Sequence, residues 1–213
     1  MPDLRNKPIR ILIVDDHPVV LAGLSSMLGT QTGIVVTGAA SGGEEALEML
    51  LSDPADLLLL DLRMPGMSGI DTLHALKRAK INARVIVLTS FETDEDIYRA
   101  VQAGAQGYLL KDTPQAEMLE AIRAVCAGRR YFPRQIAARL AERMMRTNLT
   151  ARELEVLQML ARGLTNKQIG AALDISGNTV RNHVNSVIEK LEVSDRTEAA
   201  TTAIHRGLIE SSN

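Results

Sequence analysis

Aromatic residues are scarce in this sequence, which contains no Trp and only 2% Phe, Trp and Tyr together. Stacking of exposed bases or sugars on aromatic rings is therefore not expected as the main binding mode. Cysteine is also nearly absent. The single Cys126 excludes an internal disulfide framework and fits a reducing compartment.

Long apolar segments are missing as well. No run of 18 apolar residues exists, and no N-terminal stretch combines a charged start, an apolar core and a small-residue cleavage site. We therefore expect a soluble protein of the cytoplasm with no membrane partner. The apolar share of 46% is still enough to build real cores, and 213 residues suit one large domain or two modest ones.

Charge is distributed unevenly along the chain. Residues 1–126 hold 11 Lys and Arg against 17 Asp and Glu, a net charge of −6. Residues 127–148 hold 6 Arg against one Glu, a net +5, and residues 149–213 hold 7 basic against 8 acidic residues, a net −1. These segments are an acidic front (1–126), a basic connector (127–148) and a nearly neutral tail (149–213). Their contrast indicates two domains joined by a basic connector.

Short apolar runs alternate with helical patterns through the acidic front. The runs cover residues 9–14, 34–38, 57–60, 85–88 and 108–110. After the first run, for example, Val20, Leu21 and Leu24 fall on one face of a helix. Strict alternation of this kind predicts an α/β fold: a flavodoxin-like, doubly wound parallel sheet with the strand order 2-1-3-4-5.

Polar side chains stand where these runs end. Asp15 and Asp16 follow the first run and Asp61 follows the third, while Thr89 and Lys111 end the fourth and fifth. In the order 2-1-3-4-5, the topological switch point lies between strands 1 and 3, outside their carboxyl ends. We therefore expect three carboxylates, a hydroxyl and an ammonium group at one edge of the sheet.

Such a group of residues suits phosphoryl transfer. Crowded carboxylates repel one another, and a hard divalent cation such as Mg²⁺, which takes oxygen ligands, relieves that cost. An aspartate can act as the nucleophile toward a phosphoryl group, while the cation and a lysine neutralise charge on the transferred group. Each residue alone has an ordinary explanation as a helix cap, a strand end or a solvated side chain. Their combination at successive strand ends predicts a phosphoryl acceptor at Asp61.

Short helices joined by tight turns are expected over residues 149–213, a pattern typical of a helix-turn-helix domain. The helix expected over about residues 176–191 combines an apolar stripe with a polar stripe that contains Arg181, Asn182 and Asn185. Arg and Asn read guanine and adenine in the major groove through paired hydrogen bonds. The alternative is an ordinary solvated face, and a net charge of −1 makes phosphate attraction modest for one copy.

Residues 9–126 resemble the receiver domain of two-component response regulators. The resemblance is carried by the segments VDDHP (14–18), LLLLDLRMPGMSG (57–69), VLTS (87–90) and GYLLKD (107–112). It implies that Asp61 accepts a phosphoryl group from the phosphohistidine of a partner histidine kinase. It also implies that Mg²⁺ is held by Asp16, Asp61 and the backbone carbonyl of Arg63, with Asp15 helping through water.

The same resemblance implies a way of sensing phosphorylation. Thr89 and Lys111 would bind the phosphoryl oxygens. A hydrogen bond to the phosphoryl group would draw Thr89 inward and leave space for Tyr108, its aromatic partner, to follow. This movement would remodel the surface of the helix after Thr93 and of the fifth strand.

Two other classes of function compete with a phosphorylation switch. A phosphatase with aspartyl-phosphate chemistry would need a second Asp two residues after the nucleophile, but that position is Arg63, which stays protonated. A protein-interaction adaptor would be favoured by an apolar stripe facing outward, and the polar stripe argues against it. We therefore expect a switch that is not an enzyme.

Residues 149–208 resemble the LuxR-type helix-turn-helix through LTARELEVLQMLARGLTNKQIG and ISGNTVRNHVNSVIEKL. With the receiver in front, nearly the whole chain resembles the NarL/FixJ class of response regulators. The resemblance implies a recognition helix at 176–191 and dimerisation on DNA through the last helix. One departure is Glu192, where the family usually has Gly; a left-handed conformation there costs about 1 kcal/mol. The expected DNA contacts are Thr165, Lys167, Thr179, Arg181, Asn182, Asn185 and Lys190.

These observations predict three segments: a receiver domain at 1–127, a basic and partly helical linker at 128–147, and a LuxR-type DNA-binding domain at 148–213. The expected function is that of a transcription regulator whose DNA binding is controlled by phosphorylation of Asp61. The expected partners are a sensor histidine kinase, double-stranded DNA and a second copy of the chain, which pairs on phosphorylation and on DNA.

Overall fold

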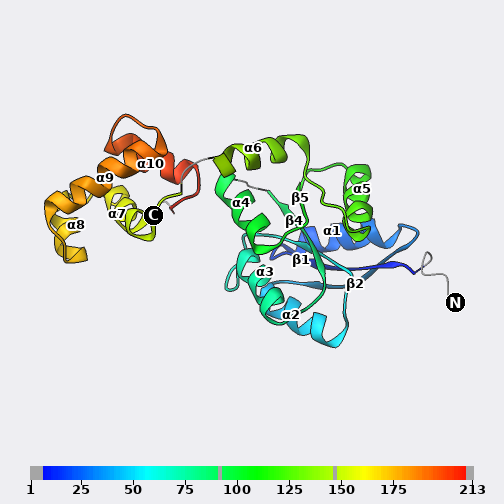
Figure 1. Cartoon of the computed structure of the whole chain (residues 1–213). Coiled ribbons are helices and arrows are strands. Elements are labelled where there is room, and N and C mark those ends of the chain that lie inside the picture. The colour runs from blue at the N-terminus through cyan, green and yellow to red at the C-terminus, as the bar shows by residue number, and fades with distance from the viewer. Residues whose placement is uncertain (1–6, 91–92, 146–147, 210–213) are drawn as a thin grey trace. The chain divides into compact units, whose positions relative to one another are not determined.

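The parallel sheet predicted from the sequence is present in the computed structural model, which describes residues 7–90, 93–145 and 148–209 (Figure 1). The strands are β1 (Ile9–Val14), β2 (Ile34–Ala40), β3 (Leu57–Leu60), β4 (Arg84–Thr89) and β5 (Gly107–Leu110). Their order in the sheet, β2-β1-β3-β4-β5, confirms the prediction. Because β1 and β3 are paired neighbours, their carboxyl ends lie side by side at the switch point.

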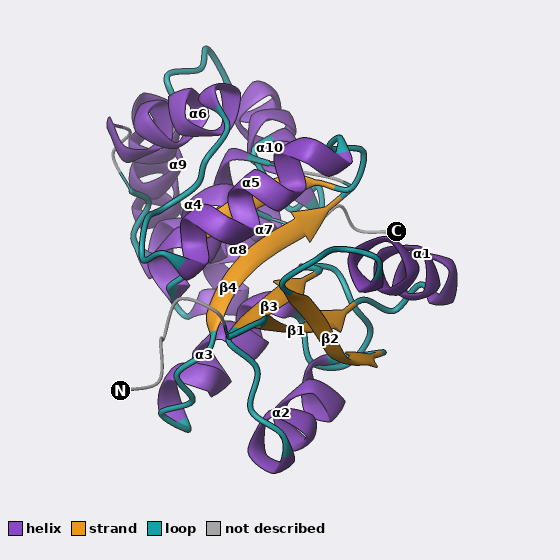
Figure 2. Cartoon of the chain, turned by 90° about the vertical axis from the view of Figure 1, so that its right-hand side faces the viewer, coloured by secondary structure: helices purple, strands orange, loops and turns teal. Residues whose placement is uncertain are grey.

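Helices lie on both sides of this sheet (Figure 2). They are α1 (Pro18–Gly29), α2 (Gly43–Ser52), α3 (Gly69–Arg78), α4 (Asp94–Ala103) and α5 (Gln115–Cys126). Apolar residues of α1 and α5 share one core with alternate strand residues such as Ile11 and Leu57. The intervening residues, such as Leu12 and Leu58, are also buried. Burial on both faces is the reason why β3 is an unbroken apolar run.

The connector after α5 first adds to the edge of the sheet. The backbone carbonyl of Tyr131 accepts a hydrogen bond from the Tyr108 N–H (3.1 Å), and the Tyr131 N–H donates to the Gln106 carbonyl (2.9 Å). Helix α6 (Arg134–Met145) follows, with Ile136 buried and Met144 63% exposed.

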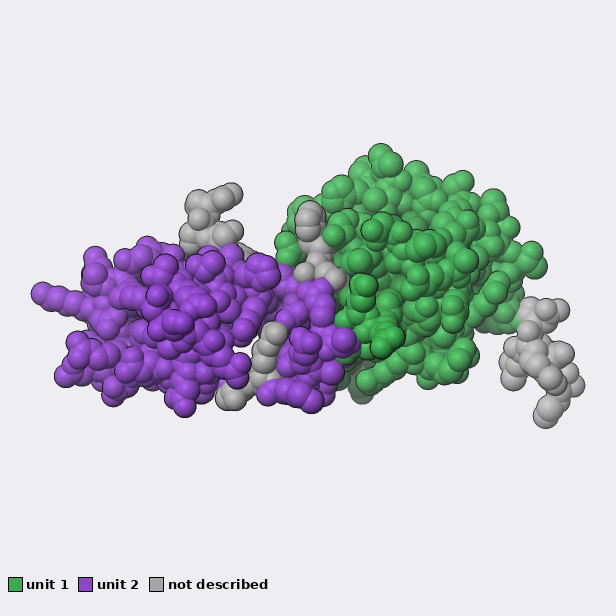
Figure 3. Space-filling view, turned by 90° about the horizontal axis from the view of Figure 1, so that it is seen from above, with its two compact units in different colours: residues 1–92, 97–137 green, residues 93–96, 138–213 purple. Residues whose placement is uncertain are grey.

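The chain divides into two compact units (Figure 3). Unit 1 holds Met1–Glu92 and Ile97–Ala137, and unit 2 holds Thr93–Asp96 and Ala138–Asn213. The first turn of α4 belongs to unit 2 because it is attached to α6. Arg143 donates to Glu95 at 2.7 Å and Arg139 donates to Asp94 at 2.9 Å. Both members of the Glu95–Arg143 pair are buried, which shields the attachment from most contact with water.

The rest of unit 2 is a set of short helices. They are α7 (Ala151–Ala161), α8 (Asn166–Leu173), α9 (Gly177–Leu191) and α10 (Arg196–His205). Capping boxes start α7 and α8, and the Ser176 hydroxyl caps α9 by accepting from the Thr179 N–H at 3.0 Å. Glu192 follows α9 with φ 57° and ψ 48°, the left-handed conformation considered above. In the described part of the chain, no helix has the length and hydropathy required to cross a bilayer.

Candidate functional site

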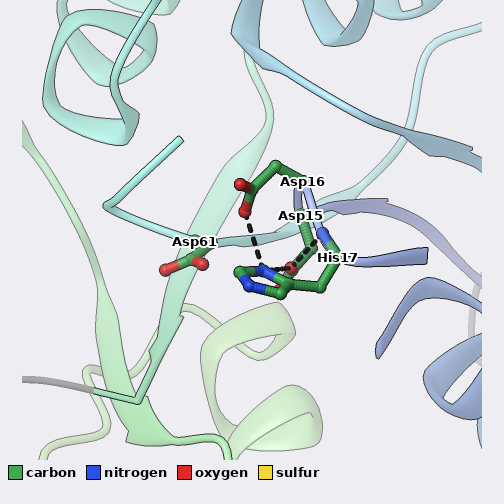
Figure 4. Close-up of side chains that lie close together, drawn as sticks. All are labelled: Asp15, Asp16, His17 and Asp61. Carbon is green, nitrogen blue, oxygen red and sulfur yellow. Dashed lines mark hydrogen bonds and ion pairs between the residues drawn. The ribbon is translucent and has the colours of Figure 1, made fainter. Parts of the chain in front are cut away.

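The polar residues at the ends of β1 and β3 meet at one edge of the sheet (Figure 4). The Asp61 N–H donates to the Val14 carbonyl at 2.9 Å, which fixes the two strand ends beside each other. One oxygen each from Asp15, Asp16 and Asp61, and a nitrogen of His17, lie within 4.8 Å of one another. The structure thus brings together the three carboxylates that the topology predicted.

Asp61 is almost sealed from solvent, with 4% of its surface exposed. The Lys111 ammonium donates to Asp61 Oδ2 at 2.6 Å and lies 2.5 Å from Asp15 Oδ2. Burial alone would lower the pKa of Lys111, but hydrogen bonds and negative charge from Asp15 and Asp61 outweigh it and raise the pKa above its usual value. Lys111 therefore places a lasting positive charge beside the Asp61 carboxylate.

The loop after β3 passes very close to the end of that strand. The Gly69 N–H donates to the Leu62 carbonyl at 3.0 Å. A Cβ atom at Gly69 would lie 2.2 Å from the Asp61 carbonyl oxygen and 2.7 Å from Leu62 Cα. These are backbone atoms that cannot turn aside, so only glycine lets α3 begin against the end of β3.

Thr89 and Tyr108 lie on the neighbouring strands β4 and β5. Thr89 is 1% exposed, and Tyr108, which pairs with Val87, is fully buried. The Tyr108 ring is therefore already inside the protein, and the inward movement expected on phosphorylation is not required from this conformation. The role of the two residues as a switch stays a prediction.

His17 completes the cluster and was not among the residues predicted for this site. Its Nδ1 lies 2.8 Å from Asp16 Oδ1 and 3.1 Å from Asp15 Oδ1. The residue occupies the N-cap position of α1, but its side chain makes no capping hydrogen bond. The signal available in the sequence was its place directly after the aspartate pair, in VDDHP.

The cluster is compatible with binding of Mg²⁺. Its donor set is dominated by carboxylate oxygens, which hard cations prefer. Asp16 Oδ1 is shielded from solvent and, among the described residues, has no partner in hydrogen-bond geometry, although His17 Nδ1 is close. A shielded carboxylate oxygen that accepts no hydrogen bond is an atom that a cation would satisfy.

A second group of predicted residues lies on α9. Arg181, Asn182 and Asn185 are exposed along one side of the helix, while Val180 and Val184 are buried on the other. The side chains predicted to read bases are thus presented to solvent from one helix face. The expected backbone-contacting residues at the starts of α8 and α9 are exposed as well: Thr165, Lys167 and Thr179.

Lys190 has a different environment from the other predicted DNA contacts. Its ammonium donates to both carboxylate oxygens of Glu153, at 2.8 and 2.7 Å, and Glu153 also accepts from the Ser186 hydroxyl at 2.6 Å. Burial would raise the pKa of Glu153, but hydrogen bonds from Lys190, Ser186 and Thr150 lower it to about 2. Lys190 thus joins α9 to α7, and its role as a DNA contact stays a prediction. The stripe pattern did not indicate this pairing because the partner comes from another helix.

Two protein families match successive parts of the chain. Residues 11–123 match the response regulator receiver domain, and residues 147–203 match the bacterial regulatory proteins of the luxR family. The transcriptional regulatory protein LiaR of Bacillus subtilis is 39% identical over 209 residues, covering 94% of this chain and 99% of LiaR. The nitrate/nitrite response regulator protein NarP of Escherichia coli is 41% identical over 199 residues, covering 90% and 93% respectively.

Solved structures are similar over nearly the whole length. The response regulator ChrA of a heme-sensing two-component system has 41% identity and a TM-score of 0.56, with 95% of this chain and 99% of ChrA covered. The Salmonella typhimurium response regulator RcsB has 26% identity and a TM-score of 0.74, with 91% and 98% covered. A structure of two RcsB dimers bound to two parallel DNAs has 25% identity and a TM-score of 0.71, with 92% and 98% covered.

Proposed function

The chain belongs to the NarL/FixJ class of two-component response regulators, in which a receiver domain precedes a LuxR-type DNA-binding domain, and on this premise we propose that phosphorylation of Asp61 controls its binding to DNA. The observation that carries the proposal is the position of Asp61. This buried carboxylate ends β3, beside Asp15 and Asp16, with the Lys111 ammonium 2.6 Å away.

The proposed reaction transfers a phosphoryl group from the phosphohistidine of a partner histidine kinase to Asp61. A carboxylate oxygen of Asp61 forms the new O–P bond as the N–P bond of the phosphohistidine breaks, and the electron pair of that bond stays with the imidazole. Lys111 neutralises charge on the phosphoryl oxygens, and Thr89 offers a hydroxyl from the end of the neighbouring strand. The receiver's own residues thus orient and stabilise the transferred group.

Mg²⁺ is the cation that we assign to this reaction. Asp16, Asp61 and the backbone carbonyl of Arg63 would hold it, with Asp15 acting through water. When bound, it would neutralise the crowded carboxylates and the incoming phosphoryl group. The shielded Asp16 Oδ1 and the carboxylate-rich donor set support this assignment.

We propose a switch rather than an enzyme that turns over its aspartyl-phosphate. The position two residues after Asp61 is occupied by Arg63, an exposed side chain. A guanidinium has N–H donors and no acceptor, so it cannot accept the proton of an attacking water. The phosphoryl group is therefore expected to persist long enough to act as a signal.

The proposed target is double-stranded DNA, bound by a homodimer. Helix α9 would enter the major groove, with Arg181, Asn182 and Asn185 reading base edges. The exposure of these side chains along one helix face supports this proposal, as does the complex of RcsB dimers with DNA. The residues placed near the DNA backbone are Thr165, Lys167 and Thr179.

Phosphate incorporation tests the proposal directly. Full-length protein is incubated with Mg²⁺ and a small acyl phosphate, and its mass is measured before and after. We expect the wild-type chain to gain one phosphate and Asp61→Asn to gain none. Asp53→Asn is the matched control, because Asp53 is an exposed aspartate just before β3, at its amino end. Full labelling of Asp61→Asn would contradict the assignment of Asp61 as the phosphoryl acceptor.

A further inference from the structure

We propose that His17 is a nitrogen ligand for transition-metal ions at the site formed by Asp15, Asp16 and Asp61, and that it strengthens their binding relative to that of Mg²⁺. The inference rests on the metal site of the proposed function and goes beyond it, because the ligands assigned there are all oxygen atoms. It concerns which ion the site selects.

The spacing of the donor atoms is the first argument. Around an octahedral ion with ligands at about 2.1 Å, adjacent ligand atoms lie about 3.0 Å apart. His17 Nδ1 lies 2.8 Å from Asp16 Oδ1 and 3.1 Å from Asp15 Oδ1. The nitrogen and the two oxygens thus already have the separations of neighbouring ligands. Figure 4 shows the imidazole ring gathered with the carboxyl groups of Asp15, Asp16 and Asp61.

A hydrogen-bonding role for the His17 ring accounts for its contact with Asp15 but not for the environment of Asp16 Oδ1. Nδ1 of His17 is in hydrogen-bond geometry with Asp15 Oδ1 at 3.1 Å. Asp16 Oδ1 is closer to the nitrogen, yet it has no hydrogen-bond partner among the described residues and solvent does not reach it. A cation between the ring and the two carboxylates would satisfy all three atoms at once.

His17 is also free to turn toward an ion. Its side chain is 64% exposed, and it does not cap α1. The backbone around it is fixed by other means: Pro18 begins the helix, and the His17 N–H donates to Asp15 Oδ1 at 2.9 Å. Small adjustments of the ring on binding an ion therefore leave the fold unchanged.

A nitrogen ligand changes the order of ion affinities. Mg²⁺ takes oxygen ligands and keeps several of its waters, so it gains little from an imidazole. Imidazole suits later first-row ions, and affinity at mixed nitrogen and oxygen sites rises from Mn²⁺ through Co²⁺ to Ni²⁺. The wild-type protein should therefore bind Co²⁺ and Ni²⁺ more tightly than Mg²⁺, and the size of this preference should fall when His17 is removed.

The test is a calorimetric titration of full-length protein with Mg²⁺, Co²⁺ and Ni²⁺ in turn. We expect His17→Ala to weaken Co²⁺ and Ni²⁺ binding by roughly tenfold or more, at least the loss that follows removal of an outer-shell partner, and to leave Mg²⁺ binding unchanged. The visible spectrum of bound Co²⁺ should change too, because water replaces the nitrogen. His74→Ala, at an exposed histidine of α3, is the matched control and should behave as wild type.

Each other outcome has a defined meaning. Equal Co²⁺ and Ni²⁺ affinities in wild type and His17→Ala overturn the inference, as does a loss of Mg²⁺ binding in the same proportion. Asp16→Ala, which removes a direct oxygen ligand, should weaken all three ions. If wild type bound no Mg²⁺, the metal site of the proposed function would fail together with this inference. Normal Mg²⁺ binding with an indifferent His17 overturns this inference alone. Thermal melts verify that the variants fold. If His17→Ala does not fold, His17→Gln is used in its place.

Discussion

At the scale of single residues, Glu153 joins two helices through one carboxylate. It completes the capping box with Thr150 at the start of α7 and accepts from Lys190 on α9. Its pKa is lowered from 4.5 to about 2, so the unfolded chain takes up this proton more readily than the folded one. The stability that Glu153 contributes is therefore fully present above pH 4.5 and is lost as the pH falls toward 2.

We predict that Glu153→Gln lowers the free energy of unfolding of unit 2 at pH 7 by about 2–3 kcal/mol, because Lys190 loses its charged partner. Between pH 4.5 and 2 the variant should lose less stability than wild type does. Urea unfolding at several pH values measures both effects. Glu155→Gln breaks only the exposed pair with Arg152 and should cost less than about 1 kcal/mol. Equal losses in the two variants would contradict the role of Glu153.

Glu192 carries backbone strain that a single substitution should relieve. Its left-handed conformation, with φ 57°, costs a residue with a Cβ atom about 1 kcal/mol relative to glycine. We predict that Glu192→Gly raises the free energy of unfolding by about that amount. Glu189→Gly, on the exposed face of α9, should instead lower it by about 1 kcal/mol. Chemical unfolding of both variants checks the opposite signs, which loss of a negative charge alone would not produce.

At the scale of secondary-structure elements, the contact between β3 and α3 fixes Asp61. We predict that Gly69→Ala slows phosphorylation of Asp61 and lowers the free energy of unfolding by about 1–3 kcal/mol, because the new Cβ atom overlaps backbone atoms of β3. Gly23→Ala is the control, since a Cβ atom there meets nothing within 4 Å and suits helix α1. Phosphate incorporation and urea unfolding report the two effects. If Gly69→Ala matched wild type in both measurements, the loop after β3 would be able to move and accept the Cβ atom, and the prediction would be contradicted.

The elements that the sequence predicted best are those whose burial is simplest. A strand buried on both faces leaves an unbroken apolar run such as Leu57–Leu60, and the fixed order of parallel strands then shows which side chains meet at their ends. The environments of Lys190 and His17 were not predicted, because they depend on side-chain directions and on a partner helix, neither of which a one-dimensional pattern contains.

At the scale of the whole molecule, the distribution of charge bears on how the protein holds DNA. The tail has a net charge of −1, and the connector arginines Arg139 and Arg143 are already paired with carboxylates of α4. Another connector arginine, Arg146, lies outside the described residues. With this net charge, the tail of one copy attracts phosphates only modestly, whereas two linked copies add their contacts and gain effective concentration.

We predict that the isolated tail, residues 147–213, binds DNA weakly, and that phosphorylated full-length protein dimerises and binds two half-sites. Sedimentation and DNA titration of both proteins measure the two properties, with Asp61→Asn as the control that should stay weak. The prediction is wrong if the isolated tail binds as tightly as the phosphorylated protein while the unphosphorylated protein does not bind. That result would favour masking of the recognition helix over pairing.

The buried Glu95–Arg143 pair also has a consequence for ionic strength. Dissolved ions screen charges that face water, and they act far less on a buried pair. Contacts between side chains and DNA phosphates weaken steeply as salt is added. Added salt therefore releases the protein from DNA while α6 stays attached to the first turn of α4. The connector helix is therefore expected to stay attached at high and at low ionic strength.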